Sequence, residues 1–122
     1  MSKRKPKKVR ATPADVLRRA RELIATPEQW TQGVAARDDG GASVAYMDPE
    51  ACKFCMLGAV WRAGADAGIG ALTEGVGARA EATLRASVRG HLADFNDHPK
   101  RRHATVLKAF DRAILLAGGT LA

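Results

Sequence analysis

The sequence predicts a mainly helical fold in which about four helices pack around a central buried helix, with a small β-hairpin and a disordered basic N-terminal arm. Apolar residues recur at helical spacing behind recognisable helix starts. Residues 48–65 are apolar on nearly every face, which is typical of a buried helix. The chain has 122 residues and 46% hydrophobic content, enough for one domain with a modest core.

The first helix is predicted from its start signal and its apolar stripe. Residues 12–15 read Thr-Pro-Ala-Asp, with a capping residue, a proline in the first turn and an acid near the positive end of the helix dipole. Helical spacing continues to Leu23, which we expect to be buried, and the helix is predicted to end near Ala25. Thr26 to Gln29 repeats the start signal and opens a short helix or turn that carries Trp30.

A hairpin is predicted near residues 33–46. Residues 33–37 and 42–46 flank the loop Asp-Asp-Gly-Gly at positions 38–41, and an acidic, glycine-rich loop of this length indicates a reversal of the chain. A two-stranded hairpin is only marginally stable alone, so we expect it to pack against helices.

The central helix is predicted over residues 48–65. Asp48 is placed to cap it and Pro49 to occupy its first turn. Gly58 costs a helix interior roughly 1 kcal/mol relative to Ala, which indicates that another element crosses closely there. Several glycines between 64 and 70 are expected to end this helix.

The remaining elements follow from apolar spacing and glycine positions. We expect a loop over 71–77, a helix over 78–89, a turn over 95–99 and a last helix over 101–117. The residues expected in the core include Cys55, Ala59, Val106 and Phe110. The predicted organisation is therefore an arm over residues 1–11 and one helical domain over 12–122.

Positive charge is concentrated at the N-terminus. The first ten residues carry +6 of the total net charge of +7 and contain no acid, which leaves +1 for residues 11–122. Such an arm neutralises nucleic-acid phosphates without reading sequence, and the alternative is a solubilising tail. The arm contains no aromatic residue, so base stacking by it is not expected. Its cations are Lys3, Arg4, Lys5, Lys7, Lys8 and Arg10.

Three segments carry a resemblance to a known family. They are Trp-Thr-Gln-Gly at 30–33, Phe-Cys-Met-Leu-Gly-Ala at 54–59 and Leu-Ala-Asp-Phe-Asn-Asp-His-Pro at 92–99. In order and spacing the chain resembles a family of small uncharacterised proteins, a domain of unknown function, from phages and high-GC bacteria. The resemblance covers most of residues 12–117. It implies a phage or prophage setting and supplies no reaction.

The chain departs from the family pattern before its last helix. Arg102 and Thr105 replace a threonine and a glutamate that would form a capping box, so we expect the helix to begin earlier, capped by Asp97 or Asn96. The replacement also creates a basic run before the last helix. We expect three of its cations to extend the nucleic-acid contact of the arm: Lys100, Arg101 and Arg102.

The two cysteines permit a metal-site hypothesis. Cys52 and Cys55 have acceptable ligand spacing, as do His98 and His103, but the gap between the pairs is far longer than in a zinc finger. Two cysteines three residues apart within a helix also face different directions. We therefore expect no metal and no cofactor, and we interpret both cysteines as small apolar residues.

A catalytic hypothesis uses the same segments. Cys55 as nucleophile, His103 as base and Asn96 or Asp97 as the orienting group would follow the logic of cysteine-dependent enzymes. The alternative is structural: Asn96 and Asp97 bond backbone N–H groups at the start of the last helix, or the helix packed beside it.

The favoured function is therefore that of a non-enzymatic phage-type accessory protein whose basic arm contacts DNA or RNA weakly through phosphates. The alternatives are a small enzyme using Cys55, and a protein-binding modulator of a host factor. There is no apolar run long enough to span a membrane and no secretory signal, so we expect a cytoplasmic protein.

Overall fold

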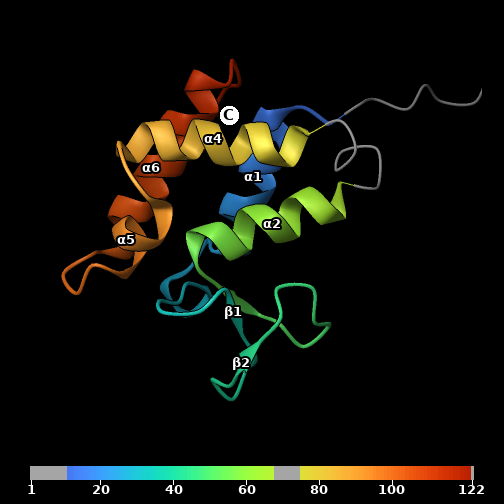
Figure 1. Ribbon diagram of the computed structural model, residues 1–122, viewed down its shortest axis with the longest axis vertical. Helices are drawn as coiled ribbons and strands as arrows, with labels where there is room; N and C mark the ends of the chain where they lie inside the picture. Colours follow the sequence, from blue (N-terminus) through green and yellow to red (C-terminus); the bar gives the residue numbers. More distant parts are fainter. Residues whose placement is uncertain (1–10, 68–74, 122) are drawn as a thin grey trace, which may run out of the picture.

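The structure is a computed structural model that describes residues 11–67 and 75–121 (Figure 1). It is mainly helical with a small antiparallel sheet, as predicted. Its helices are α1 (Pro13–Leu23), the 3-10 helix η1 (Pro27–Gln29), α2 (Met56–Asp66), α4 (Val76–Val88), α5 (Leu92–Asp97) and α6 (His103–Leu116). Its strands are β1 (Ala36–Arg37), β2 (Ser43–Val44) and β3 (Lys53–Phe54). The predicted arm and most of the predicted loop over 71–77 lie outside the described residues.

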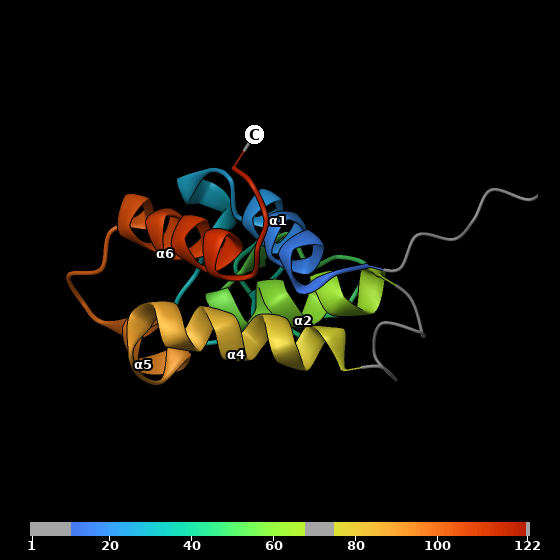
Figure 2. The same ribbon diagram turned by 90° about the horizontal axis from the view of Figure 1, so that it is seen from above.

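The four long helices form two layers (Figure 2). Helices α1 and α6 lie side by side on α2 and α4, and each pair is in contact with the other. The short helix α5 packs against α2 and α4, while the sheet lies beyond α2 (Figure 1). The large side chains of the core come from all four long helices and include Phe110, Leu17, Met56, Leu84 and Val60. In the described part of the chain, no helix combines the length and apolar character needed to cross a membrane.

Helix α1 begins as predicted. Thr12 caps it by accepting the backbone N–H of Asp15 (3.1 Å), and the Asp15 carboxylate accepts the N–H of Thr12 (3.0 Å), which completes a capping box. The prediction that Leu23 is buried is wrong, since it is only partly buried. The helix ends there, and the turn directs Ile24 into the core instead.

Helix α2 begins eight residues later than predicted, at Met56. Lys53 and Phe54 pair with β1, and the N–H of Cys55 donates to the Ala35 carbonyl (3.1 Å), so these groups are not available to a helix. Asp48 caps a turn rather than a helix, since its carboxylate accepts the N–H of Glu50 (2.7 Å). Strand pairing therefore overrides the local start signal.

Gly58 confirms the predicted close approach. A Cβ there would overlap the carbonyl oxygen of Ala35 and lie 2.8 Å from its carbonyl carbon. The element that crosses is thus the residue leading into β1, which fixes the distance between the sheet and α2. Among the residues predicted for the core, Cys55, Ala59, Val106 and Phe110 are buried.

The predicted hairpin is present, with one more strand than expected. Strand β1 is central, pairing antiparallel with β2 through Ala36 and Val44 and with β3 through Ala36 and Phe54. The third strand, β3, lies in the segment that was predicted to be the start of the central helix.

The C-terminal elements correct two predictions. Phe95, Asn96 and Asp97, predicted as a turn, form the end of α5. Helix α6 begins at His103 rather than 101, and its cap is Arg102, whose side chain makes no capping hydrogen bond. Asn96 and Asp97 do not cap it because their side chains are bonded to other parts of the chain.

Candidate functional site

The three segments that carry the family resemblance meet at Asn96. This residue is 1% exposed and is the only buried polar residue among those described. Its Oδ1 accepts the indole N–H of Trp30 (2.7 Å) and the backbone N–H of Met56 (3.0 Å). Its Nδ2 donates to the Thr31 carbonyl (3.1 Å) and to Oδ1 of Asp97 (2.8 Å). All of its hydrogen-bonding capacity is therefore used.

Residues 32 and 33 extend this Asn96 network. The Gln32 amide donates to the carbonyls of Asn96 (2.8 Å) and His98 (3.1 Å), which satisfies backbone groups at the end of α5. The N–H of Gly33 donates to the Asp97 carboxylate (2.9 Å). Asn96 thus bonds the first residue of α2 and Asp97 bonds a loop, so neither side chain makes the predicted bond to the start of the last helix.

Arg37 belongs to the same network and was not singled out from the sequence. Its guanidinium donates to the Thr31 hydroxyl (2.8 Å) and to the carbonyls of Gln32 (3.1 Å) and Gly41 (3.0 Å). It therefore joins the hairpin loop to the Trp30 segment. The sequence does show an arginine in a predicted strand beside an acidic, glycine-rich loop. From the local pattern alone, such an arginine is expected to be a solvent-exposed charge.

Cys55 lies beside this network as the cap of α2. It is 8% exposed, and its Sγ accepts the N–H of Gly58 (3.3 Å). Burial raises the pKa of the thiol and the negative charge of Asp97 adds to the shift, while the Gly58 N–H opposes it. Cysteine nucleophiles need the opposite shift, since the thiolate is the reactive species.

His103 is engaged elsewhere. Its Nε2 lies 2.7 Å from the carbonyl oxygen of Ile24, and because a carbonyl only accepts, this nitrogen carries the proton. Its ring centroid is 6.1 Å from that of Trp30. No hydrogen bond between described residues joins His103 to Cys55. The structure brings Cys55, Asn96 and Asp97 together. It does not place His103 where it could act as a base for Cys55.

The cysteines themselves differ in environment. Cys52 is exposed while Cys55 is buried, and the two are not disulfide-bonded. Within residues 11–67 and 75–121, no group of three or more His, Cys, Asp or Glu side chains is arranged to hold a metal ion.

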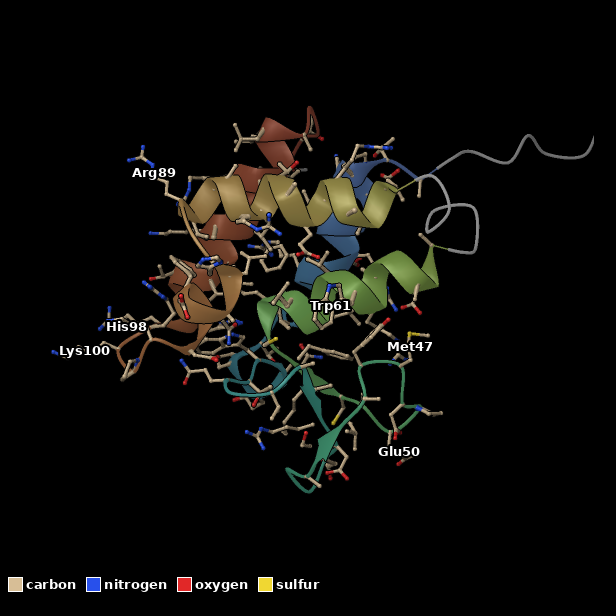
Figure 3. The ribbon with its side chains drawn as sticks, viewed as in Figure 1. Met47, Glu50, Trp61, Arg89, His98 and Lys100 are labelled. Atoms are coloured by element: carbon tan, nitrogen blue, oxygen red, sulfur yellow. The ribbon has the colours of Figure 1, made fainter. Side chains whose placement is uncertain are left out.

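Exposed cations lie at the end of α4 and in the turn between α5 and α6. We call Arg89, Lys100, Arg101 and Arg102 the basic edge. Arg101 is fixed, since it donates to the Phe95 carbonyl (2.7 Å) and its guanidinium lies 3.6 Å from the Phe95 ring centroid. The other three are exposed, and Figure 3 shows Arg89 and Lys100 projecting from the same side of the molecule.

No member of the basic edge forms an ion pair with a described carboxylate. Of the acids near these cations in sequence, Asp97 accepts backbone and amide N–H groups and Asp111 pairs with Arg21 (2.7 Å), whereas the exposed Asp94 forms no ion pair with a described residue. Other ion pairs of the described chain join Arg18 with Asp15, Arg19 and Arg62 with Asp66, and Arg85 with Glu81.

The predicted arm cations, at positions 3–10, lie outside the described residues. The start of α1, to which that segment leads, is at the end of the molecule away from the turn between α5 and α6 (Figures 1 and 2). Lys100, Arg101 and Arg102 therefore do not share a surface with the start of α1. Arg89 was not predicted as part of a nucleic-acid contact, because it lies outside the basic run that begins at Lys100.

The comparisons with known proteins agree with the resemblance at the level of the family. A family model described as a family of unknown function (DUF6197) matches residues 8–116. Neither the search of curated proteins nor that of solved structures gives a match. The matched range includes the Asn96 network, Cys55 and the basic edge. The chain therefore belongs to the family of unknown function DUF6197.

Proposed function

We propose that this protein is a non-enzymatic accessory protein that contacts nucleic acid through phosphates, using the basic arm and the basic edge. The observation that supports this most is the unpaired state of the edge: none of its four cations is neutralised by a described carboxylate. Exposed cations without acidic partners are available to phosphates, and each phosphate they neutralise releases counterions.

The start of α6 adds to the attraction for anions. The carbonyl of its cap, Arg102, accepts the N–H groups of Thr105 (3.0 Å) and Val106 (3.2 Å), but the Arg102 side chain provides no oxygen, so the positive end of the helix dipole is not offset by a capping side chain. Cations at this position oppose the dipole and cost some stability. A phosphate oxygen near Arg102 would relieve both unfavourable terms.

The chemistry favours binding without sequence preference. The aromatic ring nearest the edge, Phe95, is covered by the Arg101 guanidinium and is not free to stack on a base. The arm carries no aromatic residue. Contacts to the backbone of DNA or RNA therefore dominate, which gives weak binding that falls steeply with salt. A phage or prophage setting and a cytoplasmic location fit the resemblance and belong to the same proposal.

The test is fluorescence anisotropy with a labelled duplex and a labelled single strand at about 50 to about 200 mM salt. An edge variant carries Arg89→Gln, Lys100→Gln and Arg102→Gln, and an arm variant replaces the six cations of residues 3–10 by Gln. The matched control, Arg19→Gln with Lys53→Gln and Arg85→Gln, removes the same charge elsewhere.

Both the edge and arm variants should bind more weakly and show a shallower salt slope, by about 0.9 per lost phosphate contact on duplex DNA. The control should keep the wild-type slope. The proposal fails if the control loses as much affinity as the edge variant, or if the wild-type protein binds neither probe at low salt.

A further inference from the structure

A tryptophan is held in place on the solvent side of α2. Trp61 is 39% exposed, its indole N–H donates to Glu81 (3.0 Å), and its ring centroid lies 5.5 Å from that of Tyr46. Glu81 is itself fixed by Arg85 (2.8 Å). An exposed aromatic ring with its polar atom already satisfied loses little freedom when a partner covers it.

Two hollows beside this side chain and a third that shares lining residues with both form one surface, which we call the Trp61 groove. They measure about 250, 170 and 350 Å³. Trp61 lines the first two, Leu57 the second and third, and Glu81 the first and third. Met47, 47% exposed, follows Tyr46 and extends the apolar surface beside the groove (Figure 3).

The groove is shaped for side chains of a partner. Two of its hollows are smaller than the roughly 300–1,000 Å³ of sites that enclose a small ligand. The residue types around them, Trp, Tyr, Met and Arg, are enriched at protein interfaces relative to the rest of the protein surface.

The rim is acidic, in contrast to the basic edge. Asp97 lines the second hollow, and Asp48 and Glu50 lie in the turn that follows Met47. None of these three carboxylates forms an ion pair with another described residue. The lining itself contains two carboxylates, Glu81 and Asp97, and one guanidinium, Arg85, so the lining carries net negative charge. This surface repels phosphates and attracts cationic side chains.

We propose that the Trp61 groove binds a segment of another protein that presents a large apolar side chain next to Lys or Arg. The apolar side chain would enter a hollow beside Trp61, and the cation would lie against the acidic rim near Glu50. This binding site is separate from the proposed nucleic-acid contact and does not depend on it, because the two surfaces differ in charge sign and share no residue.

The experiment selects short random peptides on the immobilised full-length protein, rejecting those that also bind Trp61→Ala. Selected peptides should combine an aromatic or large aliphatic residue with adjacent Lys or Arg. For a synthetic selected peptide, Trp61→Ala should raise the Kd at least tenfold, as expected for a central aromatic contact. Glu50→Lys lies on an exposed turn, so it tests the charge without disturbing the helices, and it should raise the Kd several-fold.

Two controls match these variants elsewhere on the surface. Leu116→Ala removes a large exposed apolar side chain, and Glu22→Lys reverses an exposed charge; both should leave the Kd unchanged. Circular dichroism of each variant confirms that it is folded.

The proposal is overturned if no peptide remains once those that also bind Trp61→Ala are rejected, or if the remaining peptides lack basic residues. It is also overturned if sedimentation shows a Trp61-dependent dimer, which would assign the groove to a second copy. Tighter peptide binding by the variant whose arm cations are replaced by Gln would likewise assign it to the chain's own arm.

Discussion

Oδ1 of Asn96 accepts the indole N–H of Trp30 at 2.7 Å, in a part of the core where no other described polar side chain is buried. The same oxygen accepts the N–H of Met56, the first residue of α2. One amide group thus joins the end of α5 to the Trp30 segment and to the start of α2. Its loss would leave several buried groups without partners.

Asn96→Ala should therefore be strongly destabilising. The Trp30 indole N–H, the Met56 N–H and the Thr31 carbonyl lose their partner, and each buried unsatisfied group costs about 1–3 kcal/mol. We expect a loss of about 2–5 kcal/mol in the free energy of unfolding, measured by urea denaturation. Gln32→Ala, which removes bonds at a more exposed position, is the control and should cost less. Equal losses would show that the buried amide has no special role.

Gly58→Ala tests the close approach of Ala35 to α2. A methyl group there overlaps the Ala35 carbonyl, so the sheet or the helix must shift, at a cost of about 1–3 kcal/mol or more. Gly90→Ala is the matched control, since nothing lies within 4 Å of its added Cβ. Thermal unfolding should show a large decrease in Tm for the first variant only; similar Tm values would contradict the geometry.

Cys55 should react with alkylating reagents far more slowly than Cys52. Burial raises the pKa of the Cys55 thiol, so less thiolate is present at a given pH, and the side chain is also poorly accessible. Mass spectrometry after a short exposure to iodoacetamide should find label on Cys52 first. Faster labelling of Cys55 in the folded protein would indicate an activated thiol and favour the cysteine-dependent alternative.

The same pKa shift predicts how stability depends on pH. Because the folded-state pKa of Cys55 is raised, the unfolded chain releases this proton at lower pH than the folded one. The contribution to stability is fully present below the ordinary thiol pKa and is lost as pH rises through the folded value. Denaturation across the alkaline range should show a smaller decrease for Cys55→Ala than for wild type. An unchanged slope would contradict the shift.

Truncation of α1 separates the buried from the partly buried leucine. Leu17 is fully buried, so Leu17→Ala should cost about 2–5 kcal/mol. Leu23 is only partly buried, so Leu23→Ala should reduce the free energy of unfolding clearly less. Urea denaturation of both variants gives the comparison, and a cost at Leu23 equal to that at Leu17 would indicate that the end of α1 is packed more closely than described.

Local signals predicted the parts of the fold that local interactions determine. The helix start at Thr12 and the hairpin loop after Arg37 depend on residues a few positions apart, and both are present. Strand β3 could not be predicted in this way. Its partner Arg37 is distant in sequence, and Asp48 with Pro49 imitates a helix start that the chain does not use.

The candidate site was only partly accessible from sequence for the same reason. Residue types alone suggested that Cys55, Asn96 and Asp97 belong together, and the structure does bring them together. The engagement of His103 by the Ile24 carbonyl depends on how α6 packs at the end of α1, which no motif encodes. The exposure of Trp61 could not be predicted, because the residues around it in the sequence are mostly apolar and indicate a buried helix.

The bonds made by Asn96 also have a consequence for the order of folding. They span 66 positions to Trp30, 40 to Met56 and 65 to Thr31, so long loops must close before any of them can form. We expect them to form on the native side of the transition state, after the helices have associated. Asn96→Ala should then accelerate unfolding while leaving the refolding rate nearly unchanged, giving a φ-value close to zero in stopped-flow measurements. The side chain that joins the three segments would thereby govern how long the folded state persists, with little influence on how quickly it is reached.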